Sequence, residues 1–189
     1  RMMFYDIPAA LEAGQRAYEL DPQNPEALNA LARALDWAGD YEDALDVVMD
    51  AIAIDPNNAT TLAIAAEIYT DVGSWETAQT YLDEAFAADP QNVLALRNQA
   101  FLYEMQGSYT AAVESYQKAI DAAPHRFDLY IGQARQYRIG LEEYDKAIEV
   151  LQKASEIYPA PLTLDALGDG LYNAGDHLRA VQVLRRAVE

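Results

Sequence analysis

The stretch PEALNALARALDWAGDYEDALDVVMDAIAIDPNN, residues 25–58, contains the pattern that the rest of the chain repeats. Apolar residues recur every three or four positions through 25–38 and again through 41–54, which predicts two amphipathic helices. Gly39 and Asp40 separate the two segments and Pro56 follows the second, so we expect a tight turn and a proline-marked stop. This stretch therefore predicts a helix–turn–helix unit of 34 residues.

Small residues and prolines return at the same spacing along nearly the whole chain. The prolines after apolar runs are spaced by 34, 34, 34 and 35 residues, at Pro22, Pro56, Pro90, Pro124 and Pro159. Three series of small residues keep this register: Ala10, Ala44, Ala78, Ala112, Ala147 and Ala180; Ala17, Ala51, Ala85, Ala119, Ala154 and Ala187; and Ala32, Ala66, Ala100, Ala134 and Gly168. Such a period indicates stacked helical hairpins, whose helices approach closely where side chains are small.

The chain resembles a tetratricopeptide repeat array over residues 6–189. In that family the first helix carries a large residue, then Leu-Gly and then Tyr, and the second helix carries Ala, Phe, Ala and Pro. The first-helix matches are Leu28–Leu31–Ala32–Leu35, Leu62–Ala65–Ala66–Tyr69, Leu96–Gln99–Ala100–Tyr103, Tyr130–Gln133–Ala134–Tyr137 and Leu164–Leu167–Gly168–Leu171. The chain departs from the pattern because the tryptophan is missing, the second-helix aromatic is kept only at Tyr116, and Gln99 and Gln133 replace leucine.

We therefore expect an all-α fold in a single domain, residues 1–189, and the resemblance implies a right-handed α–α superhelix. It would contain a half repeat, 1–24, and five repeats, 25–58, 59–92, 93–126, 127–160 and 161–189. The eleven expected helices are 7–20, 25–38, 41–54, 59–72, 75–88, 93–106, 109–122, 127–139, 144–157, 161–174 and 177–188. Because Arg1 is not an initiator and no polar capping helix follows the last apolar helix, we expect a fragment of a longer chain.

The residues between helices predict how each helix begins and ends. Glycine suits the left-handed end of a first helix, at Gly39, Gly73, Gly107 and Gly175. We expect the residue after each glycine to cap the second helix, at Asp40, Ser74, Ser108 and Asp176. The first helices should be capped by Asn24, Asn58 and Asn92.

Two local features leave alternatives open. Residues 139–144 carry one residue more than their counterparts, which is either accommodated at the surface or changes the superhelix pitch in a way that matters for a ligand. Gln99 and Gln133 occupy equivalent positions in adjacent repeats. Since a buried amide must be hydrogen-bonded, they either bond one another across the repeat interface or one turns into the groove.

The composition disfavours several classes of partner. The formal charge is −18, from 31 acids against 13 bases, so we expect no binding to nucleic acid or anionic membranes. The chain has no cysteine, which removes disulfides and thiolate sites. It has no apolar run long enough to span a membrane. We expect a soluble acidic protein, with the cytoplasm favoured and the compartment itself left open.

No catalytic constellation is recognisable, so we expect the protein not to be an enzyme and to use no cofactor or metal. HExxH, Walker-type and GxSxG patterns are all absent. His125 and His177 fall at helix junctions of different repeats, where structural or surface roles are expected. Asp165 and Asp169 lie in a helical pattern without the ligand spacing of a calcium loop.

The resemblance implies that first helices line a concave groove in which a segment of a partner protein lies. The groove residues of the third and fourth repeats combine cations with apolar side chains. We predict a peptide-binding site at Arg97, Asn98, Phe101, Met105, Ile131, Arg135 and Arg138. Its arginines and asparagine would hold an acidic or C-terminal carboxylate group. The alternative is that the arginines pair with Glu67, Glu104 and Asp128 on neighbouring helices.

These features together predict a protein–protein interaction scaffold that binds a peptide or helical segment in the groove. The alternative is a structural module that self-associates through its terminal helices, because the last helix carries apolar residues such as Leu178 and Leu184. The identity of the partner is not encoded in the pattern.

Overall fold

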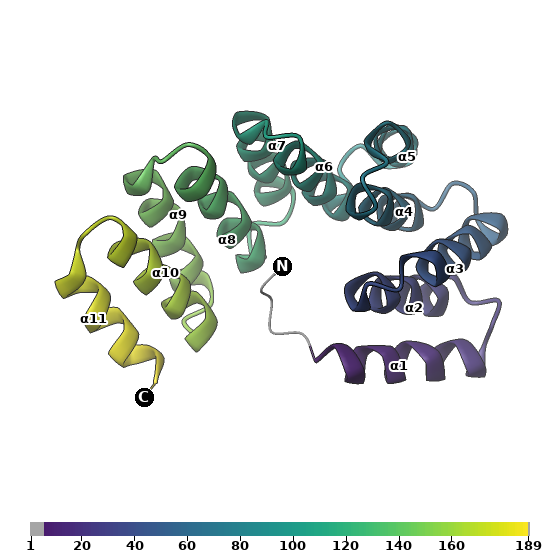
Figure 1. Ribbon diagram of the computed structural model, residues 1–189, viewed down its shortest axis with the longest axis horizontal. Helices are drawn as coiled ribbons and strands as arrows, with labels where there is room; N and C mark the ends of the chain where they lie inside the picture. Colours follow the sequence, from purple (N-terminus) through teal and green to yellow (C-terminus); the bar gives the residue numbers. More distant parts are fainter. Residues whose placement is uncertain (1–5, 189) are drawn as a thin grey trace. The chain divides into compact units, whose positions relative to one another are not determined.

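The computed structural model describes residues 6–188, and all regular structure in that range is helical. The chain forms two compact units, unit 1 (Arg1–Asn98) and unit 2 (Gln99–Glu189). Along unit 1 run α1 (Ile7–Leu20), α2 (Pro25–Ala38), α3 (Tyr41–Ile54), α4 (Ala59–Asp71), α5 (Trp75–Ala88) and the start of α6 (Val93–Met105). After α6, unit 2 contains α7 (Tyr109–Ala122), α8 (Phe127–Arg135), the π-helical turn η1 (Gln136–Gly140), α9 (Tyr144–Ile157), α10 (Pro161–Asn173) and α11 (His177–Ala187) (Figure 1).

The expected all-α fold is confirmed. Eleven α-helices lie between residues 6 and 188, and ten of them end within one residue of the expected position. The exception is the helix expected over 127–139, whose α-helical part stops at Arg135. The first five residues of the expected half repeat 1–24 lie outside the described range, and the single-domain organisation stays a prediction.

Within each unit, consecutive hairpins contribute to a shared apolar core. Most residues of the alanine series are buried between helices and let the large side chains interleave around them, whereas Ala10, Ala17 and Ala187 near the chain ends are partly buried. In unit 1 one buried cluster comprises Ala32, Ala44, Val48, Ile64, Ala65 and Ile68. In unit 2 a corresponding cluster comprises Ala134, Ala147, Leu151, Leu167, Leu171 and Ala180. The core thus requires each hairpin to contact its neighbour within the unit.

Asparagine caps the first helices as expected. The side-chain oxygen of Asn24 accepts from the backbone N–H of Glu26 at 2.9 Å and of Ala27 at 3.2 Å. Asn58 caps α4 through two such bonds, and Asn92 accepts from Ala95 at 3.0 Å. These bonds satisfy amide groups that have no partner inside the helix.

The second helices begin differently from what we expected. Asp40, Ser74 and Ser108 stand at the N-cap positions, but their side chains form no capping hydrogen bond, so that part of the prediction is wrong. Of the four expected caps only Asp176 forms such a bond, accepting from the Arg179 N–H at 3.1 Å. The turn itself is closed by the backbone, because Gly39 has φ 89° and the Asp40 N–H donates to the Leu35 carbonyl at 3.0 Å.

The extra residue of the fourth repeat is absorbed inside a helix. Residues Gln136–Gly140 form a π-helical turn, in which the Leu141 N–H donates to the Gln136 carbonyl at 3.1 Å. Gly140 lies against the Tyr109 ring so closely that any side chain at position 140 would clash with it. The insertion is therefore accommodated by widening the helix end instead of lengthening the loop.

Glu142 replaces glycine at the left-handed position that follows this turn. Its φ is 56°, and it is the only non-glycine residue with positive φ among residues 6–188. The left-handed conformation is unfavourable for residues with a Cβ atom. Repeat 127–160 therefore carries backbone strain that the glycine-containing turns avoid.

We expect Glu142→Gly to stabilise the protein by about 1 kcal/mol, because it relieves this strain. Urea denaturation followed by circular dichroism measures the change. Glu143→Gly is the matched control, since Glu143 has φ −91° and gains nothing from glycine. Equal effects of the two substitutions would contradict the assignment of strain to Glu142.

Candidate functional site

The seven residues of the predicted peptide site fall in both units. Arg97 and Asn98 belong to unit 1, whereas Phe101, Met105, Ile131, Arg135 and Arg138 belong to unit 2. Each group is therefore described within its own unit. In both, a glutamate on a first helix determines what the arginines contact.

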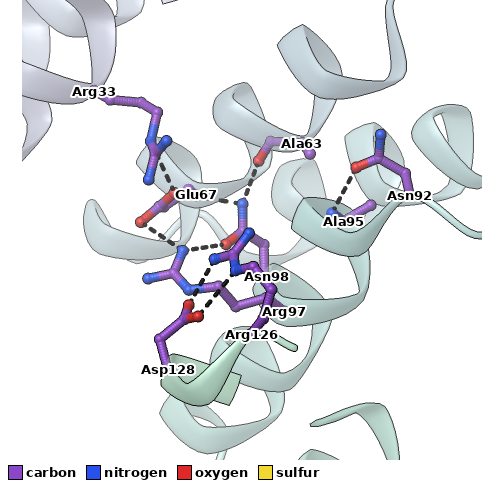
Figure 2. A network of polar contacts seen from close by, with 9 residues as sticks. All are labelled: Arg33, Ala63, Glu67, Asn92, Ala95, Arg97, Asn98, Arg126 and Asp128. Atoms are coloured by element: carbon purple, nitrogen blue, oxygen red, sulfur yellow. Dashed lines mark hydrogen bonds and ion pairs between the residues drawn. The ribbon is translucent and has the colours of Figure 1, made fainter. Parts of the chain in front are cut away.

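In unit 1 the carboxylate of Glu67 on α4 joins three first helices. Arg97 on α6 donates to Glu67 Oε1 at 3.4 Å, and Arg33 on α2 lies 4.0 Å from Oε2. Asn98 donates from Nδ2 to Glu67 Oε2 at 3.4 Å and to the Ala63 carbonyl at 2.8 Å. Figure 2 shows these side chains pointing toward one another, with Glu67 between the two guanidinium groups.

This network is an internal one. The Glu67 side chain is only 1% exposed, so its charge requires the two guanidinium groups and the Asn98 amide for compensation. Asn98 is itself fully buried, and its Oδ1 accepts from Arg97 at 3.0 Å. The guanidinium of Arg33 also lies 4.9 Å above the Trp37 ring, a cation–π distance. A ligand carboxylate at Arg97 would have to compete with Glu67.

In unit 2 the corresponding carboxylate is Glu104, near the end of α6. It accepts from Arg135 Nη2 at 2.5 Å and from Gln136 Nε2 at 2.7 Å. These bonds bring the last turn of α6 next to the residues where α8 passes into η1. The side chains of Arg135 and Glu104 are 37% and 23% exposed, so this pair is more accessible to solvent than the Glu67 network.

The remaining predicted residues of unit 2 offer apolar surface and one further cation. Met105 is 45% exposed, while Phe101 and Ile131 are half-buried. Ile139, which was not in the predicted set, is 60% exposed. Arg138 lies in η1 beside Ile139 and is half-buried. Among residues 6–188 it forms no side-chain hydrogen bond or ion pair, unlike Arg97 and Arg135. It is therefore the cation of the predicted set that is available to a ligand.

The pairing alternative is confirmed for two of the three arginines, since Arg97 pairs with Glu67 and Arg135 with Glu104. Asp128 is held instead by Arg126, at 2.6 Å. Gln136, which the sequence reasoning missed, is buried and bonded to Glu104. The sequence could have indicated this role, because a polar side chain that is buried among core residues needs a hydrogen-bond partner.

The two glutamines in the leucine positions are both buried. Gln133 Nε2 donates to the Val113 carbonyl at 3.2 Å and to Gln117 Oε1 at 3.1 Å, both on α7. The donor group of Gln133 is thus used by the preceding helix and is not turned toward a ligand. Gln99 also has a polar partner.

Two further kinds of feature were expected to be absent, a metal site and a membrane span. In the range 6–188, no three histidine, aspartate or glutamate side chains are grouped closely enough to hold a metal ion. None of the described helices has the length and apolar character needed to cross a membrane. Whether the protein catalyses a reaction stays a matter of prediction.

Comparison with protein families gives matches along most of the chain. Tetratricopeptide repeat families match residues 65–127 and residues 128–161. The family described as anaphase-promoting complex, cyclosome, subunit 3, matches residues 3–85. No curated protein matches the chain.

Solved structures show where the fold recurs. The crystal structure of MamA is 24% identical with a TM-score of 0.65, covering 84% of this chain and 92% of that one. The protein TTC0263, a thermophilic TPR protein of Thermus thermophilus, is 22% identical with a TM-score of 0.74, covering 93% and 91%. The human IFIT1 dimer with PPP-AAAA is 21% identical with a TM-score of 0.74, covering 97% and 45%. At such identities the likeness concerns the fold alone.

Glu67→Ala should lower the free energy of unfolding by about 1–3 kcal/mol, because it removes the buried acceptor that two arginines and the Asn98 amide share. Glu149→Ala is the matched control. It removes the same atoms from an exposed pair with Lys153, and should cost less than about 1 kcal/mol. Midpoints of urea denaturation at constant m-value measure both changes. A loss at Glu149 equal to that at Glu67 would contradict the difference in burial.

Proposed function

Because this chain belongs to the tetratricopeptide repeat family, we propose that it is a scaffold that holds a segment of a partner protein on the first helices of unit 2. The surface comprises Phe101, Met105, Ile131, Arg135 and Arg138. The observation that carries the proposal is Arg138, a cation without an intramolecular partner in the described range, beside the exposed Ile139. The partner segment would supply a carboxylate and apolar side chains.

The electrostatics of this surface favour one cation over the others. The guanidinium of Arg135 already donates to Glu104, so a ligand carboxylate gains less from it than from Arg138. Arginine also presents a planar fork that can bind a carboxylate through two parallel hydrogen bonds. We therefore assign Arg138 the role of carboxylate anchor and Arg135 a supporting role.

The exposed apolar side chains have a separate role. Met105 and Ile139 flank the arginines, and covering them with leucine or phenylalanine side chains of a partner removes apolar surface from water. Helices that are already folded keep the ordering cost on the scaffold side low. Protein binding at this surface is thus driven by apolar burial, and Arg138 adds selectivity for acidic segments.

Arg138→Ala should weaken binding of an acidic peptide about tenfold, the effect of one charged hydrogen bond. The probe is a dye-labelled peptide with leucines, glutamates and a free C-terminal carboxylate, measured by fluorescence anisotropy. Arg135→Ala should weaken it by a smaller factor.

Lys153→Ala is the control for general charge, since Lys153 lies on α9 and pairs with Glu149. Equal affinity of the probe for the wild type, Arg138→Ala and Arg135→Ala would remove the proposed site. So would equal weakening by Lys153→Ala, because attraction would then depend on net charge alone.

A second candidate function is self-association through α11. Leu178 is 73% exposed, and Val181 and Val188 are also exposed apolar residues of this segment. Exposed apolar side chains at helical spacing are typical of surfaces that pack on another helix. The two functions can be distinguished, because self-association occurs in the absence of any peptide ligand.

Leu178→Glu should abolish self-association, because it places a charge in the apolar contact. Light scattering coupled to size-exclusion chromatography, over a range of protein concentrations, measures the mass. Leu178 is preferred to Leu184 for this test, because Leu184 packs against Gly168 and a charge there would disturb the fold. A wild-type protein that stays monomeric at high concentration would exclude this function.

The exclusion of nucleic acid stays a prediction from the net charge. The charge of −18 opposes a polyanion, but the fold alone does not decide the matter, because IFIT1 has been solved with PPP-AAAA.

A further inference from the structure

Unit 2 contains an open cavity that shares no lining residue with the surface around Arg138. It has a volume of about 620 Å³ and lies where α9, α10 and α11 meet. Leu167, Leu171 and Val183 form its apolar part, and Gln152 of α9 lines one wall. Cavities that hold small ligands or side chains have volumes in this range.

The same place in unit 1 is filled by aromatic side chains. By the repeat register, Leu171 corresponds to Tyr69 and Val183 to Tyr81. The rings of these two tyrosines stack with centroids 5.4 Å apart. The Tyr81 hydroxyl also lies 3.5 Å from the sulfur of Met49, whose counterpart in unit 2 is Gln152. Burial raises the pKa of Tyr81 above its ordinary value, with smaller contributions from Tyr69 and Glu84.

The cavity in unit 2 thus has a simple origin. Two tyrosines are replaced by a leucine and a valine, and neither side chain reaches as far as an aromatic ring. The space that the Tyr81 ring fills between α3 and α5 is left open between α9 and α11. Because the space corresponds to the position of the Tyr81 ring in unit 1, a single aromatic side chain would fit there.

The charged residues around the cavity indicate which kind of group would lie next to the aromatic side chain in a partner. Arg179 and Arg186 of α11 line it, and so does Glu156 of α9. Residues 177–187 contain three arginines and no acid, whereas residues 34–96 contain no lysine or arginine. Arg179 is bound to Asp176 at 3.3 Å, but within residues 6–188 Arg186 has no ion pair. An acidic group would therefore be attracted to the α11 side.

We propose that this cavity binds an aromatic side chain from an acidic segment of a partner protein. The ring would occupy the space between Val183 and Gln152, and a neighbouring carboxylate would contact Arg186. This site shares no residue with the surface around Arg138 and does not depend on it.

The experiment uses the full chain with labelled leucine and valine methyl groups, observed by NMR. The probe is a short acidic peptide with one phenylalanine between glutamates, and copies with alanine in place of phenylalanine or lysine in place of glutamate. The expected result is shifted methyl signals at Leu167, Leu171 and Val183 with the first peptide only. Absence of these shifts at high peptide concentration would overturn the proposal.

Three variants separate the contributions. Val183→Tyr fills the cavity as in unit 1, and should weaken peptide binding at least tenfold without lowering the melting temperature. Should this variant misfold, Val183→Phe, which places the same ring there without a hydroxyl group, takes its place with the same expected weakening. Arg186→Ala should weaken binding about fivefold.

Arg185→Ala is the matched control for Arg186→Ala. Both arginines lie in the last turn of α11, where each interacts with the helix dipole, but only Arg186 lines the cavity. Equal weakening by the two variants would overturn the assigned contact.

Arg138→Ala should leave these methyl shifts unchanged, so failure of this site and failure of the proposed scaffold surface can be told apart. If phenylacetate shifts the same methyl signals and the peptide does not, the occupant is a small aromatic acid and the proposal of a protein segment is wrong.

Discussion

Close approach of paired helices is the constraint on which the rest of the structure depends. Two helices can lie side by side at short distance only where the side chains between them are small. Ala32, Ala66 and Ala112 are fully buried in such positions, and the leucines and isoleucines around them form the core of each unit. This line of contact between paired helices, the seam, determines which helix faces are buried. The other faces can hold charged side chains or border a cavity.

The seam also explains why the sequence predicted the helices so closely. Alanine and proline recur in one register, and asparagine stands before three first helices, so both ends of most helices were determined locally. The position of the extra residue before Tyr144 could not be predicted in this way. A residue inserted in a loop and one inserted in a widened helix give the same spacing in the sequence. The close contact between Gly140 of η1 and Tyr109, which belongs to another helix, could not be read from the local sequence.

The candidate site was predictable as a set of residues but not as a set of bonds. Repeat position identified Arg97, Arg135 and Arg138 as neighbours of acids, but which arginine had a partner depended on side-chain geometry. Asn98 could not be recognised as buried, since its amide is held by the Ala63 carbonyl, a backbone group that no pattern of side chains identifies. The sequence did not indicate the cavity beside Val183, because valine and tyrosine both fit the apolar pattern of the repeat. Only the difference in their sizes leaves the space open.

Glu67 has a consequence for how unit 1 comes apart. Most hairpins of such an array contact only their neighbours, so opening proceeds one hairpin at a time. The Glu67 carboxylate is bound from α2 and from α6 at once, and a partly opened state that separates either helix leaves a buried charge behind. Backbone amides of α4 therefore exchange their hydrogens with solvent only when all three helices separate together, and the middle of unit 1 is the last part to fray.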